Sequence, residues 1–143
     1  MLIGLDPILS PQLLYILRAM GHGDRIVIAD ANFPGDSCAS KLVRLDGVDA
    51  SRALKAVLSV MPLDTYAEDP AISMQVVGDP SEVPEAVADF QRIIDETAGT
   101  AASITPVERF AFYEAAKSAY AVVQTGERRF YGNIILTKGV VPA

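Results

Sequence analysis

Short runs of β-branched residues alternate with amphipathic helical segments along this sequence, and this alternation is the feature that most restricts its fold. Apolar residues recur at helical spacing over 50–61 and 84–99. The run "RIVIADA" (25–31) is instead typical of a buried strand. Further strand candidates span 41–47, 71–77, 120–126 and 133–139. With no internal repeat or linker, this order predicts one α/β domain over residues 1–143: a single compact layered unit with a mixed or mostly parallel sheet flanked by helices.

Residues at the ends of these segments carry local signals. Ser10-Pro11 is expected to open a helix, with Ser as the N-cap and Pro at the first helical position. Asp49 is expected to cap the helix over 50–61. Thr105 and Glu108 fit a capping box for a helix that runs to about residue 119. The stretch "NFPGDS" (32–37) reads as a loop.

The charge and the rare residue types exclude several classes of protein. The net charge is -6, so a phosphate backbone is repelled and no nucleic-acid partner is expected. No apolar stretch approaches the ~18 residues of a membrane span, and the N-terminus lacks the basic region of a signal peptide. One cysteine and one histidine make neither a disulfide nor a Cys/His zinc site. The sequence therefore predicts a cytoplasmic protein without a Cys/His metal site, although a carboxylate site for a hard cation stays open.

Half of the residues are hydrophobic, although the chain has only 143 residues. A small domain with this much apolar surface has to bury some of it outside its own core. We therefore expect a homo-oligomer, with a subunit interface covering the excess.

The only histidine, His22, lies between two glycines in "MGHGD" (20–24). In one interpretation this is a helix C-terminus, with Gly21 after the C-cap in a positive-φ conformation and His22 solvated. In the other, the glycines let the backbone approach a ligand and the imidazole transfers a proton near neutral pH. The spacing alone slightly favours the first interpretation.

Other candidate residues also have two interpretations. Asp30, at the end of the strand candidate 25–31, either hydrogen-bonds its own loop or accepts hydroxyl groups of a polyol. Arg109, in the first turn of its helix, either forms a surface ion pair with Glu108 or Glu114 or contacts a ligand. Tyr131, Gly132 and Asn133 form a plain turn or part of a site. A nucleophilic triad of Cys38, His22 and Asp30 is disfavoured, because a lone cysteine is usually an inert small hydrophobe.

Four blocks in order resemble the L-fucose mutarotase family, whose close relative is the D-ribose pyranase family. The blocks are "LSPQLLYILRAMGHGDRIVIADANFP", "MPLDTY", "ERFAFYEAAKSAYAVVQTGE" and "YGNIILTKGV". The resemblance covers nearly the whole chain and is weakest over 70–100. The "ERFAFYE" block and the ending of the chain look like the fucose branch.

The resemblance implies a cofactor-independent isomerase that interconverts the α and β anomers of a free monosaccharide. The likeness to the fucose branch implies that this monosaccharide is L-fucose. It implies that His22 is the catalytic proton donor. Sugar binding is implied for Asp30, Arg109, Tyr131, Gly132 and Asn133. It also implies a dimer or a ring of subunits, with the sugar site near an interface.

Three alternatives remain open from the sequence. One is a D-ribose pyranase, which interconverts pyranose and furanose rings by the same chemistry. The others are a monosaccharide-binding protein that catalyses nothing and a small structural ring protein with a vestigial pocket. Intact His22 and Asp30 argue against the last two.

Overall fold

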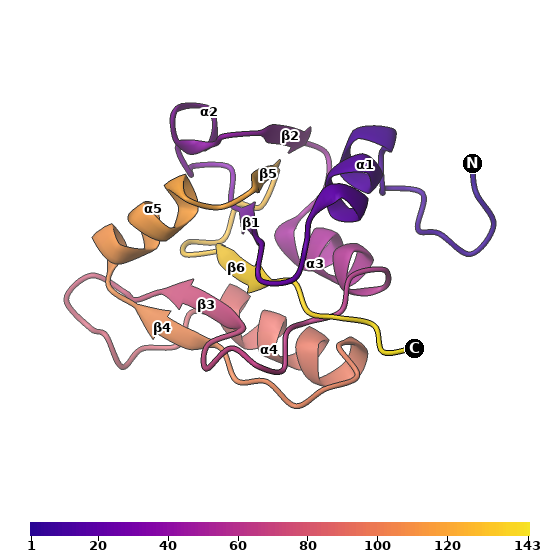
Figure 1. Cartoon of the computed structure of the whole chain (residues 1–143). Helices are drawn as coiled ribbons and strands as arrows, with labels where there is room; N and C mark the ends of the chain where they lie inside the picture. The colour runs from indigo at the N-terminus through magenta and orange to yellow at the C-terminus, as the bar shows by residue number, and fades with distance from the viewer.

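The computed structural model describes all residues, 1–143, as a six-stranded sheet flanked by five helices (Figure 1). In chain order the elements are α1 (Pro11–Ala19), β1 (Arg25–Ala29), α2 (Gly35–Cys38), β2 (Leu42–Leu45), α3 (Ala50–Leu58), β3 (Ala71–Met74), α4 (Glu85–Thr97), β4 (Thr105–Val107), α5 (Arg109–Lys117), β5 (Ala121–Thr125) and β6 (Ile134–Thr137). No helix is both long enough and apolar enough to span a membrane.

The sheet is mixed, as predicted, and its strand order is β2-β5-β1-β6-β3-β4. The pairs β2–β5, β5–β1 and β3–β4 are parallel. Strand β6 runs antiparallel to both of its neighbours, β1 and β3. Strand β6 therefore begins beside the carboxyl end of β1 and ends beside its amino end. The candidate residues lie at these two ends of the strands.

Helices cover both faces of the sheet, which makes a three-layered domain (Figure 1). Successive side chains of a strand point to opposite faces, and β1 shows this directly. Ile26 and Ile28 pack with α1, α3 and α4 in the larger core cluster. Val27 and Ala29 pack with α2 and α5 in the smaller one. Because both faces are covered, the central strands are mostly apolar.

The local signals are mostly confirmed. The side chains of Ser10 and Asp49 accept hydrogen bonds from the backbone N–H groups of the first turns of α1 and α3. The capping box at Thr105 is wrong, because Thr105 belongs to β4 and pairs with Ile72 of β3. Glu108 is the N-cap of α5.

Two smaller expectations are also wrong. The positive φ near the end of α1 lies at Gly23 (86°) and not at Gly21. Gly21 instead donates its N–H to the Asp24 carboxylate, at 2.7 Å, so the turn is closed by a side chain. The stretch 32–37 is not only a loop, since the short helix α2 begins within it.

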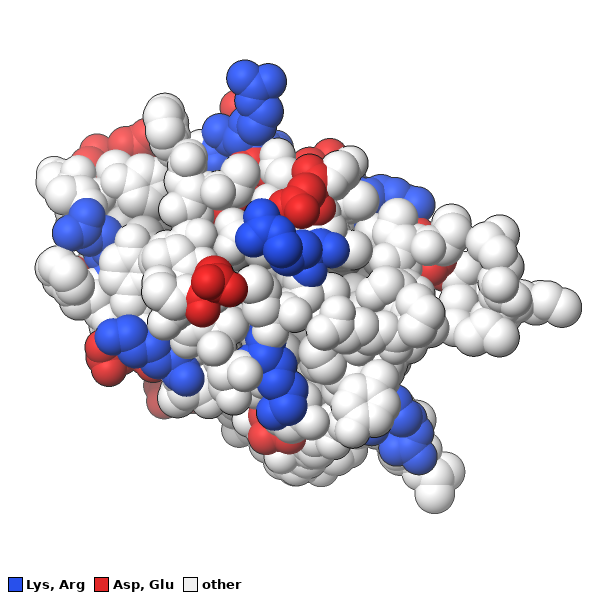
Figure 2. Space-filling model, turned by 90° about the horizontal axis from the view of Figure 1, so that it is seen from above, with Lys and Arg blue, Asp and Glu red and all other residues white.

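Lysine, arginine and acidic side chains alternate on the face shown in Figure 2, with no continuous patch of one sign. A nucleic-acid interface needs a basic stripe or patch. This face offers none, in keeping with the acidic net charge.

Candidate functional site

Asp30 lies at the carboxyl end of β1 and is held there by Asn133, which directly precedes β6. The Asp30 N–H donates to Asn133 Oδ1 (2.8 Å), and Asn133 Nδ2 donates to Asp30 Oδ2 (2.9 Å). The other carboxylate oxygen accepts the N–H of Asn32 (3.0 Å). The first interpretation of Asp30 is therefore confirmed, and its role toward a polyol stays a prediction. Asp30 bonds its own loop, and it is also fixed by a second candidate residue.

Burial raises the pKa of Asp30, and its hydrogen bonds with Asn32 and Asn133 offset only part of that effect. The residue is 5% exposed. A buried carboxylate is costly unless it is fully hydrogen-bonded. The two oxygens offer more acceptor sites than these two donors use, so hydroxyl donors from a ligand would complete the set.

The segment Tyr131-Gly132 has a special backbone. Tyr131 is the only residue other than glycine with a positive φ, 58°, a conformation that costs energy and is often found at functional sites. Its hydroxyl oxygen accepts the N–H of Val77 (3.1 Å) from the loop after β3. A Cβ on Gly132 would lie 2.6 Å from Glu127 Cγ and 3.4 Å from Asp30 Cβ. Glycine is therefore needed for this segment to pass so close to Glu127.

Glu127 and Arg129 form an ion pair next to the Tyr131-Gly132 segment. Glu127 accepts three hydrogen bonds from Arg129, from its N–H (2.9 Å), Nε (3.0 Å) and Nη2 (2.8 Å). Arg129 Nη2 also donates to Ser51 of α3 (2.9 Å), and Nη1 lies 3.6 Å from Asp89 of α4. The hydrogen bond from Arg129, stronger than the opposing effect of burial, holds the pKa of Glu127 below its usual range. The loop is thus tied to two helices by a charge-assisted network.

An open cleft of about 420 Å³ lies over Asp30 and Asn133. Its polar lining is Asp30, Asn32, Arg109 and Asn133, and its apolar and aromatic lining is Phe33, Met74, Val77, Tyr113, Phe130 and Tyr131. A few convergent polar groups beside an apolar wall are the usual lining of a small-molecule site. Four of the five residues for which the resemblance implied sugar binding line the cleft, namely Asp30, Arg109, Tyr131 and Asn133. The fifth, Gly132, lies between Tyr131 and Asn133 in the chain but is not part of the lining.

Arg109, at the first position of α5, is exposed, and the ion pair considered from sequence is not formed. Glu108 caps the helix and Glu114 pairs with Lys117. The Arg109 guanidinium lies over the Phe110 ring, 4.7 Å from its centroid, where a cation–π contact can orient it. Its donors are therefore free to bind a ligand in the cleft.

His22 lies at the opposite edge of the sheet, before β1. Its Nε2 is 3.0 Å from Asp64 Oδ1, and its ring packs edge-on to Tyr66 with centroids 5.6 Å apart. The side chain of His22 is 46% exposed and that of Asp64 is 5% exposed. His22 is thus more than a solvated helix end, because a buried carboxylate holds it.

His22 and Asp30 lie apart within one chain. The five residues of β1 separate them, and a strand of that length spans about 16 Å. The eight-residue spacing in sequence is misleading, because an extended strand places its two ends at opposite edges of the sheet. Nor does a Cys38 triad form, since the Cys38 thiol points to the carbonyl of Tyr113 at 3.9 Å.

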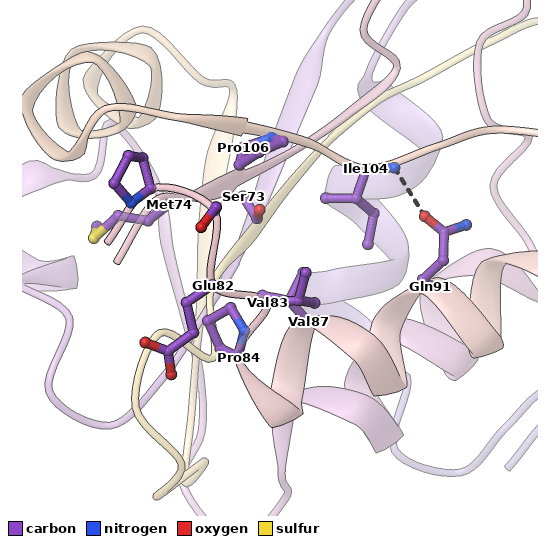
Figure 3. Close-up of a pocket in the computed structure, with 11 residues that line it drawn as sticks. Ser73, Met74, Glu82, Val83, Pro84, Val87, Gln91, Ile104 and Pro106 are labelled. Atoms are coloured by element: carbon purple, nitrogen blue, oxygen red, sulfur yellow. Dashed lines mark hydrogen bonds between the residues drawn. The ribbon is translucent and has the colours of Figure 1, made fainter. Parts of the chain in front are cut away.

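A second cavity, of about 230 Å³, lies between β3, β4 and the start of α4 (Figure 3). Prolines and aliphatic side chains dominate its wall, and Gln91 is already engaged by the N–H of Ile104 at 2.9 Å. It has no basic side chain and no pair of convergent polar groups. It is therefore less suited to a polyol than the Asp30 cleft.

Sequence reasoning missed several residues of these two clusters. Asp64 and Tyr66 stand in the block "MPLDTY", which was noticed only for its resemblance and given no role. Phe33 follows β1, whereas Met74 and Val77 lie at the end of β3 and just after it, so only the folded sheet brings them into one cleft. No sequence signal pointed to the contact of Asp64 with His22.

Comparison with known proteins agrees with this geometry. Residues 3–141 match the model of the RbsD / FucU transport protein family. The chain is 47% identical to "Fucose mutarotase" of Danio rerio, over 97% of this chain and 94% of that protein. It is similar to the crystal structure of the fucose mutarotase of Streptococcus pneumoniae in complex with L-fucose, with 45% identity, 99% and 100% coverage and a TM-score of 0.92.

The similarity to the ribose branch is weaker. Bacillus subtilis RbsD, complexed with D-ribose, has 25% identity and a TM-score of 0.74 over 98% of this chain and all of that one. The mixed sheet, the flanking helices and the match over nearly the whole length lead to one conclusion. The chain belongs to the RbsD / FucU family.

Proposed function

We propose that this protein is an L-fucose mutarotase, an isomerase that interconverts the α and β anomers of free L-fucose. The observation that carries the proposal is the cleft over Asp30. Its carboxylate, amide and guanidinium groups can bind ring hydroxyls, and its apolar wall of Phe33, Met74 and Tyr113 suits the C6 methyl of a 6-deoxy sugar. The stronger similarity to fucose mutarotases than to the D-ribose complex supports the same sugar.

Anomer exchange needs only proton transfers. A base removes the proton from the anomeric hydroxyl, the O1 electron pair forms the C1=O bond, and the C1–O5 bond breaks. The ring oxygen takes a proton from an acid. Rotation about C1–C2 then presents the other face of the aldehyde, and the reverse steps close the ring. General acid–base catalysis of this kind contributes ~10² to 10⁴ in rate, or about 3 to 5 kcal/mol of barrier.

We assign the proton transfers to His22, because a neutral imidazole can both accept and give a proton near neutral pH. We assign sugar binding to Asp30, Arg109 and Asn133, with Tyr131 and Gly132 shaping the cleft. The Asp30 carboxylate and the Asn133 amide lie side by side and are buried and fixed, so they meet the sugar already in position.

This assignment needs a second subunit, and we infer that the active site is shared between two copies of the chain. Within one chain His22 and the Asp30 cleft lie at opposite edges of the sheet. Exposed apolar side chains stand beside both: Phe110, Val77 and Phe130 around the cleft, and Tyr66 beside His22. An interface that covers these groups would bring His22 of one copy to the cleft of the next, and it would bury the apolar excess.

The cytoplasm is the compartment that we infer. The single cysteine, Cys38, is buried and reduced. Proteins that depend on disulfides are characteristic of oxidising compartments instead.

Two measurements test the function. The first is NMR exchange spectroscopy of L-fucose, D-ribose, D-galactose and D-glucose with chelator-treated protein. We expect the fastest anomer exchange with L-fucose. Ring-form exchange of D-ribose alone would indicate a pyranase, and binding without any exchange would indicate a monosaccharide-binding protein.

The second measurement tests the shared site by mixing two impaired variants, His22→Ala and Asp30→Asn, under conditions that let subunits reassort and at an L-fucose concentration too low to saturate Asp30→Asn. In a shared site, the intact His22 of the Asp30→Asn variant meets the intact Asp30 of the His22→Ala variant in about a quarter of random pairings. We therefore expect the mixture to recover about that share of the wild-type rate, whereas the separate variants do not. No recovery after proven reassortment would place both residues in one chain's site.

A further inference from the structure

The main chain on both sides of Asp30 is bound by the end of β5 and the loop that follows it. The hydroxyl of Thr125 donates to the carbonyl of Ala29 at 2.7 Å. The N–H of Ala31 donates to the carbonyl of Glu127 at 2.9 Å. The position of Asp30 at the cleft therefore depends on the position of Glu127.

Glu127 reaches the other half of the cleft with its side chain. A Cβ on Gly132 would lie 2.6 Å from Glu127 Cγ and 3.2 Å from the carbonyl oxygen of Arg129. Gly132 directly precedes Asn133, which binds the Asp30 carboxylate. Glu127 thus binds the residue after Asp30 with its main chain and packs against the residue before Asn133 with its side chain.

Arg129 holds the carboxylate of Glu127 in one orientation. Arg129 Nε donates to Oε1 at 3.0 Å and Nη2 donates to Oε2 at 2.8 Å, so the guanidinium binds both oxygens. The main-chain N–H of Arg129 is a further donor to Oε1, at 2.9 Å. A bidentate contact of this kind fixes direction as well as distance. The Glu127 side chain cannot rotate without breaking it.

Two helices of the larger core fix Arg129 in turn. Its Nη2 donates to the hydroxyl of Ser51 in α3 at 2.9 Å. That hydroxyl donates to Asp89 of α4, and Arg129 Nη1 lies 3.6 Å from the same Asp89 oxygen. The orientation of the Glu127 carboxylate is therefore set by packed helices and not by the loop itself.

Neither Glu127 nor Arg129 lines the cleft. A ligand there would feel them only through the residues that they hold. One of these is Tyr131, two residues after Arg129, whose φ of 58° is a costly conformation. Such a conformation persists only where the surrounding structure holds it in place.

We propose that Glu127 and Arg129 are positioning residues for sugar binding, an ion pair that keeps Asp30 and Asn133 in their binding geometry before the sugar arrives. This inference rests on the proposed mutarotase function. Groups that are already ordered avoid the entropy cost of being ordered on association. The pair therefore acts on the affinity for the sugar, whereas the proton transfer depends on His22.

The test compares Arg129→Met with a matched control, Arg92→Met. Methionine keeps much of the apolar length of arginine but removes the guanidinium, which leaves the buried Glu127 without its charged partner. Arg92 also pairs with Asp89, and with Glu96, but it forms no hydrogen bond or ion pair with Glu127. The control therefore removes an arginine from the same helix surface and leaves the Glu127 contact in place.

A double variant, Glu127→Gln with Arg129→Met, shows whether the two residues act as one unit. The neutral amide oxygen can still accept the main-chain N–H of residue 129, and no buried charge is left unpaired. We therefore expect the double variant to bind L-fucose more tightly than Arg129→Met alone. If Arg129→Met does not fold, Arg129→Lys takes its place, because lysine keeps the charge and loses the bidentate contact.

The first readout separates the dissociation constant of L-fucose from kcat for anomer exchange. Ordering one or two side chains on binding corresponds to a ~10-fold change in affinity. We expect a rise of that size in the dissociation constant of Arg129→Met, a smaller change in kcat, and wild-type values in Arg92→Met. Urea unfolding records stability separately. A pair that only stabilised the fold would lower the urea midpoint and leave the affinity of the folded protein unchanged.

The second readout is structural and does not depend on activity. The chain has two asparagines, Asn32 and Asn133, so ¹⁵N-asparagine gives two side-chain amide signals by NMR. The Asn133 amide is buried and donates to Asp30, whereas Asn32 is exposed. We expect the Asn133 amide to be protected from exchange with water. Protection should persist in Arg92→Met and fall in Arg129→Met.

Unchanged L-fucose affinity in the folded Arg129 variant, an equal loss in Arg92→Met, or undiminished protection of the Asn133 amide would each overturn the proposal. So would a double variant that binds L-fucose more weakly than Arg129→Met. If the wild-type protein does not accelerate L-fucose exchange, the proposed function fails instead. The Asn133 amide signal still reports in that case whether the ion pair holds the cleft.

Discussion

Asn133 holds Asp30 by two hydrogen bonds, one to its main chain and one to its carboxylate. Asn133 Oδ1 accepts the Asp30 N–H at 2.8 Å, and Nδ2 donates to Oδ2 at 2.9 Å. The pair joins the end of β1 to the start of β6 across 103 residues of sequence. Because the amide uses both of its ends on Asp30, the carboxylate has one fixed direction toward the cleft.

Replacing Asp30 by Asn should weaken sugar binding more than it slows the chemistry. The new amide puts its NH₂ opposite the donor of either Asn32 or Asn133 and removes an acceptor for sugar hydroxyls. A hydrogen bond to a charged group is worth about 1.5–3 kcal/mol, which corresponds to a ~10- to 100-fold rise in the dissociation constant. Titration of L-fucose followed by NMR measures it. An unchanged affinity would remove Asp30 from the sugar site.

Replacing His22 by Ala should leave the fold intact and lower the catalysed rate by at least ~10². The side chain is 46% exposed, so its removal leaves no large internal cavity. No second histidine can replace it. Circular dichroism checks the fold and exchange spectroscopy checks the rate. A folded variant with a near wild-type rate would mean that "MGHGD" is only a helix end.

Replacing Gly132 by Ala should damage the site through the backbone. The added Cβ would meet Glu127 Cγ at 2.6 Å, so either Glu127 or the Tyr131–Asn133 segment has to shift. Overpacking of this kind typically costs about 1–3 kcal/mol of stability. We expect a lower midpoint in urea and a lower L-fucose affinity, whereas Gly47→Ala, at a position with open space around it, should alter neither.

The stability of the protein should fall as the pH drops below the usual range of carboxyl groups. The pKa values of Glu127, Asp64 and Asp89 are lowered in the folded state. Their stabilisation is complete above the unfolded pKa values of about 4 and is lost as the pH falls through the folded ones. The raised pKa of Asp30 acts in the opposite sense, because its ionisation at higher pH costs stability.

Glu127→Gln tests this pH dependence. Its amide cannot accept all three hydrogen bonds of Arg129, so we expect a loss of ~1–3 kcal/mol at neutral pH. Urea unfolding between pH ~2 and 6 should show a weaker dependence on pH than in the wild type. An unchanged pH dependence would mean that Glu127 contributes little through its charge.

The sequence predicted those parts of the structure that depend on local interactions. Ser10 and Asp49 cap their helices because the groups they bind lie within three residues. Thr105 also has the local pattern of a cap, but pairing with β3 competes for it, and its hydroxyl binds Asp69, 36 residues away. Tertiary pairing prevailed over the local signal.

The candidate site shows the same limit. The residues Tyr131, Gly132 and Asn133 are consecutive, and Asp30 is brought beside them by the pairing of β1 with β6. The apolar runs of the sequence indicate these two strands but not that they pair. Asp64 could not be assigned in this way, because its contact with His22 depends on where Thr137 and Lys138 place a distant loop. Nor does the eight-residue spacing between His22 and Asp30 show by itself that β1 places the two side chains at opposite ends of a strand.

In the shared site that we propose, the antiparallel course of β6 gives each subunit two unlike half-sites, with Asn133 at the start of the strand and the residues that hold the His22 turn after its end. An open row of subunits leaves one half-site at each end without its complement, whereas a closed assembly completes every site. The catalysed rate then depends on association as well as on the number of chains. Dilution below the dissociation constant of the assembly would lower the activity without unfolding the chain.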